Sequence, residues 1–176
     1  MTYRPELDKI IHRMGDYMKN CSKKLLVYRI ILLFLTFLLV VFIFSNSAQT
    51  AQVSSETSGR LVTFLNNICY SLHLNFTINQ DIVRTLAHFA EFGVLGVLSL
   101  LTSFSFFGIN AKTLIISIVF SLTVALMDEI IQIFSEGRAF QFTDLAVDFA
   151  GLLTGAVSVF LFSLLINNHR IKVQRR

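Results

Sequence analysis

The chain has 176 residues, of which 54% are hydrophobic, with 18 phenylalanines and a single proline. A mean hydropathy of +0.66 leaves more apolar surface than one small soluble core can bury, so the composition excludes an ordinary soluble domain. The formal net charge is +4, but its basic residues gather beside apolar runs, which favours membrane topology and contact with anionic lipid over nucleic-acid binding.

Four apolar stretches are long enough to cross a hydrocarbon core about 30 Å thick, which needs roughly 20 helical residues. They cover residues 25–44, 86–107, 113–134 and 145–166. The first contains one charge, Arg29, whose long side chain is expected to reach back to the lipid headgroups. Its apolar run exceeds that of a signal peptide, which indicates a retained anchor. The predicted fold is an all-α membrane protein built as a four-transmembrane-helix bundle.

The segment 45–83 between the first two stretches is expected to lie outside the membrane. It opens with a serine-rich run and continues with apolar residues at i, i+3, i+4, i+7 and i+11, a pattern typical of an amphipathic helix. These apolar residues are Leu61, Phe64, Leu65, Ile68 and Leu72. We expect a short external helix that lies on the membrane surface or covers a pocket.

Basic residues predict the orientation, because cytoplasmic flanks and short loops carry more lysine and arginine. They are concentrated in the N-terminal segment 1–24 and the tail 167–176, which flank the membrane domain 25–166, and Lys112 adds to the loop 108–112. The opposite connections contain Arg60, Arg84 and Arg138. Both termini are therefore predicted to be cytoplasmic.

Polar residues of three helices then fall at one external depth. They are His88 and Glu91 in the second stretch, Asp128, Glu129 and Gln132 in the third, and Asp144 and Asp148 at the start of the fourth. Spacings of three or four residues place three pairs each on one helix face: His88 with Glu91, Asp128 with Gln132, and Asp144 with Asp148. A carboxylate facing lipid is costly, so these faces should point into the bundle. Glycines at 93, 96, 151 and 155 offer small surfaces for close helix packing. The sequence predicts one outward-opening polar pocket.

The motifs FSNSAQ, HFAEFGVLG, DEIIQIFSEGR and TDLAVDFAGLLTG occur in this order. Together they resemble the bacterial VanZ-like family over roughly residues 40–160. The family often has a histidine between the glutamate and the glutamine of the third motif, where this chain has Ile130 and Ile131. The family is named for a protein that gives low-level teicoplanin resistance. The resemblance implies a bacterial cytoplasmic-membrane protein that acts in the cell envelope or in glycopeptide resistance.

The first functional hypothesis is a binding module for an envelope lipid, a lipid-linked cell-wall precursor or a glycopeptide. Arg138 would contact a phosphate, because its planar fork suits that anion. The surrounding acids would repel the phosphate unless they pair with Arg138 and Arg84. The predicted binding residues are Ser45, Gln49, His88, Glu91, Asp128, Glu129, Gln132, Arg138, Asp144 and Asp148.

The alternative is a metal-assisted lipid-phosphate hydrolase or transferase. Glu91, Asp128, Asp144 and Asp148 are the candidate ligands for a divalent metal ion, with His88 or Glu129 as general base. No H-E-x-x-H metal motif occurs, so the sequence leans away from an enzyme.

A transporter and a purely structural cluster are the two remaining hypotheses for the polar residues. A transporter is disfavoured because the inner half of each helix reads as almost purely apolar. A purely structural cluster would pair Arg138 with Asp128 or Asp144, and His88 with Glu91. The sequence leaves the oligomeric state open.

Overall fold

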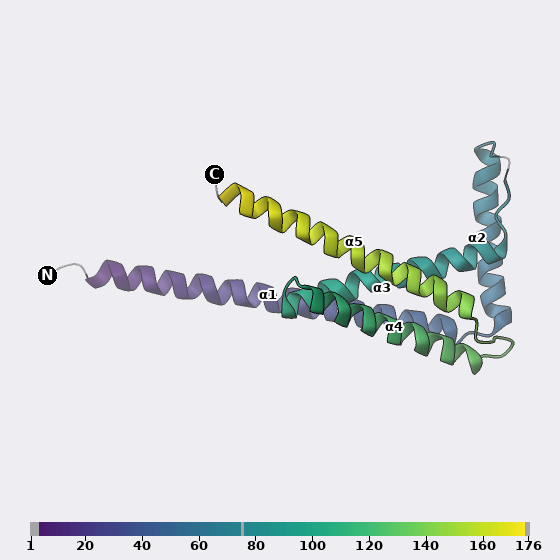
Figure 1. Ribbon diagram of the computed structural model, residues 1–176, viewed down its shortest axis with the longest axis horizontal. Helices are drawn as coiled ribbons and strands as arrows, with labels where there is room; N and C mark the ends of the chain where they lie inside the picture. Colours follow the sequence, from purple (N-terminus) through teal and green to yellow (C-terminus); the bar gives the residue numbers. More distant parts are fainter. Residues whose placement is uncertain (1–3, 75, 175–176) are drawn as a thin grey trace.

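The computed structural model describes the backbone of residues 4–74 and 76–174 and the side chains of residues 22–74 and 76–167. Within these residues the chain forms helices and no strand. The helices are α1 (Arg4–Ser47), α2 (Ala51–Ser71), α3 (Gln80–Phe107), α4 (Ala111–Ile133) and α5 (Phe142–Gln174). All of them except α2 run along the length of the molecule, and α2 crosses the end where α1 and α4 finish and α3 and α5 begin (Figure 1).

Four helical segments are long and apolar enough to cross a membrane. They are Ser22–Ser47, Gln80–Phe107, Ala111–Ile133 and Phe142–Asn167. The predicted all-α membrane fold with four spanning helices is confirmed. The start of α1 and the end of α5 both extend away from α2 (Figure 1). Many of the basic residues behind the orientation prediction fall in 1–21 and 168–176, whose side chains lie outside the described part of the structure.

Helices α2, α3 and α4 each begin after a threonine or asparagine that caps them. Asn79 accepts a hydrogen bond from Ile82 N at 2.9 Å, so α3 starts before the apolar stretch predicted from residue 86. Asn110 caps α4 in the same way through Thr113 N at 3.0 Å. Between these two helices Gly108 has φ +75°, a conformation that glycine adopts without a steric cost and that turns the chain back.

Helix α2 is longer than the amphipathic pattern predicts. Thr50 accepts from Val53 N and starts the helix inside the serine-rich run, which the sequence alone reads as a polar lead-in. The apolar residues Leu61 and Phe64 of α2, and Leu72 directly after it, remain exposed. The helix packs on α3 at the end of the bundle, so its polar first half lies beside the beginning of α3.

The closest helix contact joins α3 and α5. A Cβ atom on Gly151 would collide with Phe89 O, and one on Gly155 would collide with Gly93 O, so only glycine permits this approach of the two backbones. This close approach of the two backbones is the packing role predicted for these glycines. The core beside this contact consists of Ile43, Phe92, Leu95, Val124, Ala125 and Leu152.

Polar contacts also occur in the half of the bundle away from α2, which differs from the sequence-based expectation. Ser99 Oγ lies 2.7 Å from Ser117 Oγ and 2.9 Å from Ser121 Oγ, and all three residues are buried. Arg29 does not extend outward: its Nε donates to Ser105 O at 2.8 Å. Mean hydropathy does not identify buried serines, because their hydroxyl groups can form hydrogen bonds with one another. It also does not show that an arginine such as Arg29 can donate to a free backbone carbonyl near the end of a neighbouring helix.

Candidate functional site

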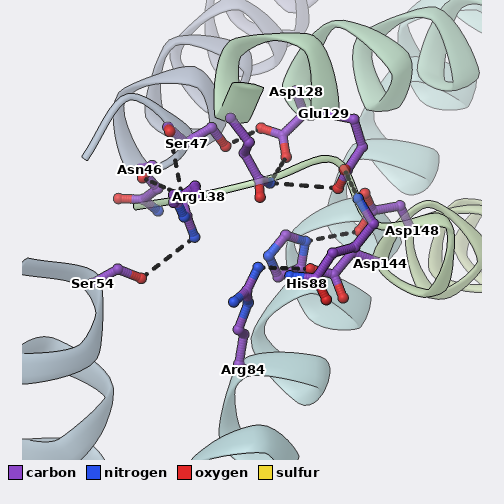
Figure 2. Close-up of polar contacts among 12 residues, drawn as sticks. Asn46, Ser47, Ser54, Arg84, His88, Asp128, Glu129, Arg138, Asp144 and Asp148 are labelled. Atoms are coloured by element: carbon purple, nitrogen blue, oxygen red, sulfur yellow. Dashed lines mark hydrogen bonds and ion pairs between the residues drawn. The ribbon is translucent and has the colours of Figure 1, made fainter. Parts of the chain in front are cut away.

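The polar residues of the sequence meet at the end of the bundle that α2 crosses. They come from the end of α1, the beginning of α3, the end of α4, the beginning of α5 and the connection 134–141 (Figure 2). Antiparallel order explains the convergence, because α1 and α4 end at the level where α3 and α5 begin (Figure 1). Most of the predicted site residues therefore lie in one region.

Asp128 on α4 is 1% exposed and is held from two helices. Ser47 Oγ donates to its Oδ1, and Gln132 Nε2 donates to its Oδ2 at 3.0 Å. Ser135 Oγ in turn donates to Ser47 O at 2.7 Å. These bonds fix the end of α1 against the end of α4.

Ser47 lies within the predicted segment 45–49 but is not among its individually predicted residues, which are Ser45 and Gln49. Ser45 is exposed, and its hydroxyl donates to Val41 O of its own helix. The helical period explains the position of Ser47. Because α1 continues to Ser47 and Ile43 is buried one turn earlier, Ser47 lies on the same face of α1 and points into the bundle.

Glu129 is fully buried and fastens the connection that follows α4. Its Oε2 accepts from the backbone N–H of Gln141 at 2.9 Å, and its Oε1 lies 3.5 Å from Gln132 Nε2. The carboxylate does not line either cavity described below. This position suits a structural acceptor better than the general base considered from the sequence.

An ion pair and a histidine–carboxylate contact join α3 to α5, one helical turn apart. Arg84 Nη2 lies 2.7 Å from Asp144 Oδ2, and His88 Nδ1 lies 3.0 Å from Asp148 Oδ1 (Figure 2). His88 therefore pairs with Asp148, and the pairing with Glu91 considered from the sequence is wrong. Glu91 accepts instead from Asn46 Nδ2 at 3.2 Å. The partners across helices depend on rotation about each axis, which sequence spacing does not specify.

Arg138 bonds to backbone and hydroxyl oxygen. Its Nη1 donates to Asn46 O and Ser47 O, both at 3.2 Å, and its Nη2 lies 3.4 Å from Ser54 Oγ (Figure 2). The carbonyls belong to the end of α1, where a cation is favourable. Within the described residues Arg138 has no carboxylate partner, in contrast to the pairing with Asp128 or Asp144 considered above. Burial, and after it the charge of Arg84, lowers the pKa of the Arg138 guanidinium.

A cavity of about 540 Å³ opens between the end of α1, α2 and the first turns of α3. Its polar lining is Asn46, Ser47, Gln49, Ser54, Thr57, Ser58, Arg60, Arg84, His88, Glu91 and Arg138, and its apolar lining is Leu61, Val83 and Ala87. A smaller cavity of about 330 Å³ shares four of these residues, Ser54, Ser58, Arg84 and Arg138.

The predicted site residues thus divide into two groups. Gln49, His88, Glu91 and Arg138 line the larger cavity. Asp128, Glu129, Gln132, Asp144 and Asp148 do not line this cavity and form contacts within the bundle, and Ser45 belongs to neither group. The hydroxyl residues of α2 and Arg60 were not among the predicted site residues. Their sequence matches no binding motif, and they reach the cavity only because α2 lies beside it.

The predicted metal ligands also divide. His88, Asp128 and Asp148 each offer a ligand atom, and these atoms lie within 4.8 Å of one another. Glu91 and Asp144 are not part of this group, since their carboxylates bond to Asn46 and Arg84.

Comparison with known proteins gives one match. The profile of the VanZ/LLP1 family matches residues 31–164, a range that includes every residue of the polar region. The family resemblance of the four motifs is therefore confirmed. No curated protein and no solved structure matches the chain.

Proposed function

We propose, given that the chain belongs to the VanZ/LLP1 family, that it is a membrane protein whose larger cavity binds the phosphate-bearing headgroup of an envelope lipid or lipid-linked cell-wall precursor. One observation carries the proposal: Arg60, Arg84 and Arg138 line the same cavity, together with hydroxyl groups of α2. Arginine forks and hydroxyl donors are the groups that recognise a phosphate.

The arrangement of charge supports an anionic ligand. Burial lowers the pKa of Arg138 most, and repulsion from the Arg84 guanidinium lowers it further. Both side chains line the two cavities. An anion bound between them would reduce this repulsion and would accept hydrogen bonds from their N–H groups.

Most of the acidic residues are bonded to other groups, which weakens the repulsion of a phosphate expected from the sequence. Asp144 is paired with Arg84 and Asp148 with His88, while Asp128 and Glu129 accept hydrogen bonds inside the bundle. Of the acidic residues, Glu91 alone lines the cavity within the described part of the chain, and it accepts from Asn46. The positive groups at the cavity wall therefore outnumber the negative ones.

The proposal includes a location. We place the protein in the bacterial cytoplasmic membrane with both termini cytoplasmic and the cavity at the outer leaflet, in agreement with the basic terminal segments. The exposed Leu61 and Phe64 of α2, with Leu72 directly after it, would then enter the interface, and the hydrocarbon chain of the lipid would follow the apolar lining of the cavity. A role in envelope function or in glycopeptide tolerance follows from sequestering or presenting such a headgroup without turnover.

A titration of the purified full chain with a short-chain polyprenyl phosphate tests the proposal. The double variant Arg84→Gln/Asp144→Asn removes one guanidinium while leaving no unpaired carboxylate. Losing a charge-assisted hydrogen bond costs about 1.5–3 kcal/mol, so Kd should rise roughly 10- to 100-fold.

Lys112→Gln is the matched control, because Lys112 is an exposed cation at the opposite end of the bundle. Its Kd should equal that of the unmodified chain. An equal weakening by both variants would mean that general charge, and not the cavity, attracts the lipid.

A further inference from the structure

A compact group of potential metal ligands lies behind the cavity, between α3, α4 and α5. His88, Asp128 and Asp148 contribute ligand atoms within 4.8 Å of one another, and His88 Nδ1 is 3.0 Å from Asp148 Oδ1. In a tetrahedral site with bonds of about 2.0–2.1 Å the ligand atoms are about 3.3 Å apart. Movements on the order of 1 Å would therefore close these side chains around an ion.

Two buried oxygen atoms, one in this group and one on Gln132, which bonds to Asp128, have no hydrogen-bond donor among the described residues. They are Asp148 Oδ2 and Gln132 Oε1, and both residues are 0% exposed. The Gln132 amide is fixed in its orientation, because its Nε2 donates to Asp128 and lies beside Glu129. A flipped amide would direct its oxygen at two carboxylates. Buried acceptors are rarely left without a partner, so these oxygen atoms are available to a water molecule or to a cation.

The charges in the same volume are unbalanced. Asp128, Glu129 and Asp148 are at most 1% exposed, and within the described chain His88 is the one basic side chain bonded to any of them. Arg84 is bonded to Asp144, and Arg138 donates to carbonyls and Ser54. Buried carboxylates beside a single imidazole are neutralised either by protons or by a compensating cation.

We propose that His88, Asp128 and Asp148, with Gln132 Oε1 as a further oxygen donor, bind a divalent transition-metal ion, Zn²⁺ or Mn²⁺. One imidazole with carboxylate and amide oxygen suits these ions better than Mg²⁺ or Ca²⁺, which prefer all-oxygen sites. His88 lines the larger cavity, so the ion enters from that side. Ion binding does not require a bound headgroup, and the ion ties α3, α4 and α5 together where their polar ends meet.

The test uses the full chain in detergent, stripped with a chelator and then dialysed against Zn²⁺ or Mn²⁺. We expect one ion per chain by elemental analysis and a rise in melting temperature on loading. Co²⁺ as a probe should give the visible absorption of a protein-bound, histidine-ligated ion. Asp128→Asn and Asp148→Asn should weaken binding about 10- to 100-fold or more.

Glu136→Gln is the control, since Glu136 is an exposed acid in the connection that follows α4. Its ion binding should match that of the unmodified chain. The proposal is overturned if the unmodified chain retains no ion and shows no melting shift, a result that does not depend on how the variants fold. Equal ion binding by the Asp148→Asn and Glu136→Gln variants overturns it as well.

Discussion

Gly151→Ala should disturb the fold and the polar site together, because Gly151 lies at the closest approach of α5 to α3. The new Cβ would overlap Phe89 O and would lie 3.2 Å from both Gly93 N and Phe89 C. Non-bonded carbon atoms prefer separations of about 3.5–4.0 Å, so the two helices must move apart by roughly 1 Å.

The magnitude follows from the bonds that cross the same interface. A shift of about 1 Å would stretch Arg84–Asp144 and His88–Asp148, now 2.7 and 3.0 Å long, beyond hydrogen-bonding distance. Overpacking of this kind costs about 1–3 kcal/mol. The variant should therefore unfold more easily and should also bind the polyprenyl phosphate less tightly.

The assay is thermal or denaturant-induced unfolding of the purified chain in one detergent, with Gly59→Ala as the control. Gly59 lies within α2, and a Cβ added there meets nothing within 4 Å. Alanine in a helix interior is favoured over glycine by about 1 kcal/mol, so this variant should be neutral or slightly more stable. Equal stability of the two variants would refute the close contact of α3 and α5.

Two smaller effects are expected inside the bundle. Ser47→Ala removes a donor from the buried Asp128 carboxylate and should lower the free energy of unfolding by about 1–3 kcal/mol, whereas Ser45→Ala, at an exposed hydroxyl, should have no effect; equal results in the same unfolding assay would contradict the inward position of Ser47. Ser99→Ala breaks the hydroxyl contacts with Ser117 and Ser121 and should cost about 0.6–1.2 kcal/mol, since interhelical polar contacts in membranes contribute little each; a loss several times larger would mean that these serines have a role beyond packing.

The fold and the region of the site could be predicted from the sequence because both depend on strong, local patterns. Apolar length identifies four spanning helices, and the cost of a carboxylate in lipid turns acidic residues such as Asp128 and Asp148 toward the bundle. Small residues such as Gly151 indicate close helix contacts before any coordinates are known.

The detailed contacts could not be predicted, because they depend on helix ends and rotations. Ser47 is in the network and Ser45 is not, a difference of two residues that follows only from the continuation of α1 to its last turn. The pairing of His88 with Asp148 rather than Glu91 depends on how α3 is rotated against α5. No sequence pattern around Arg60 indicates a binding site. The residue lines the cavity only because α2 crosses the end of the bundle.

The central claim is that the cavity recognises a phosphate and not merely a lipid chain. The most direct measurement compares the binding of a polyprenyl phosphate with that of the corresponding neutral polyprenol to the unmodified chain, in the same detergent and at the same ionic strength. The arrangement of Arg84 and Arg138 predicts that the phosphate binds at least about tenfold more tightly, equivalent to about 1.4 kcal/mol. Equal affinity for the two lipids would contradict the claim.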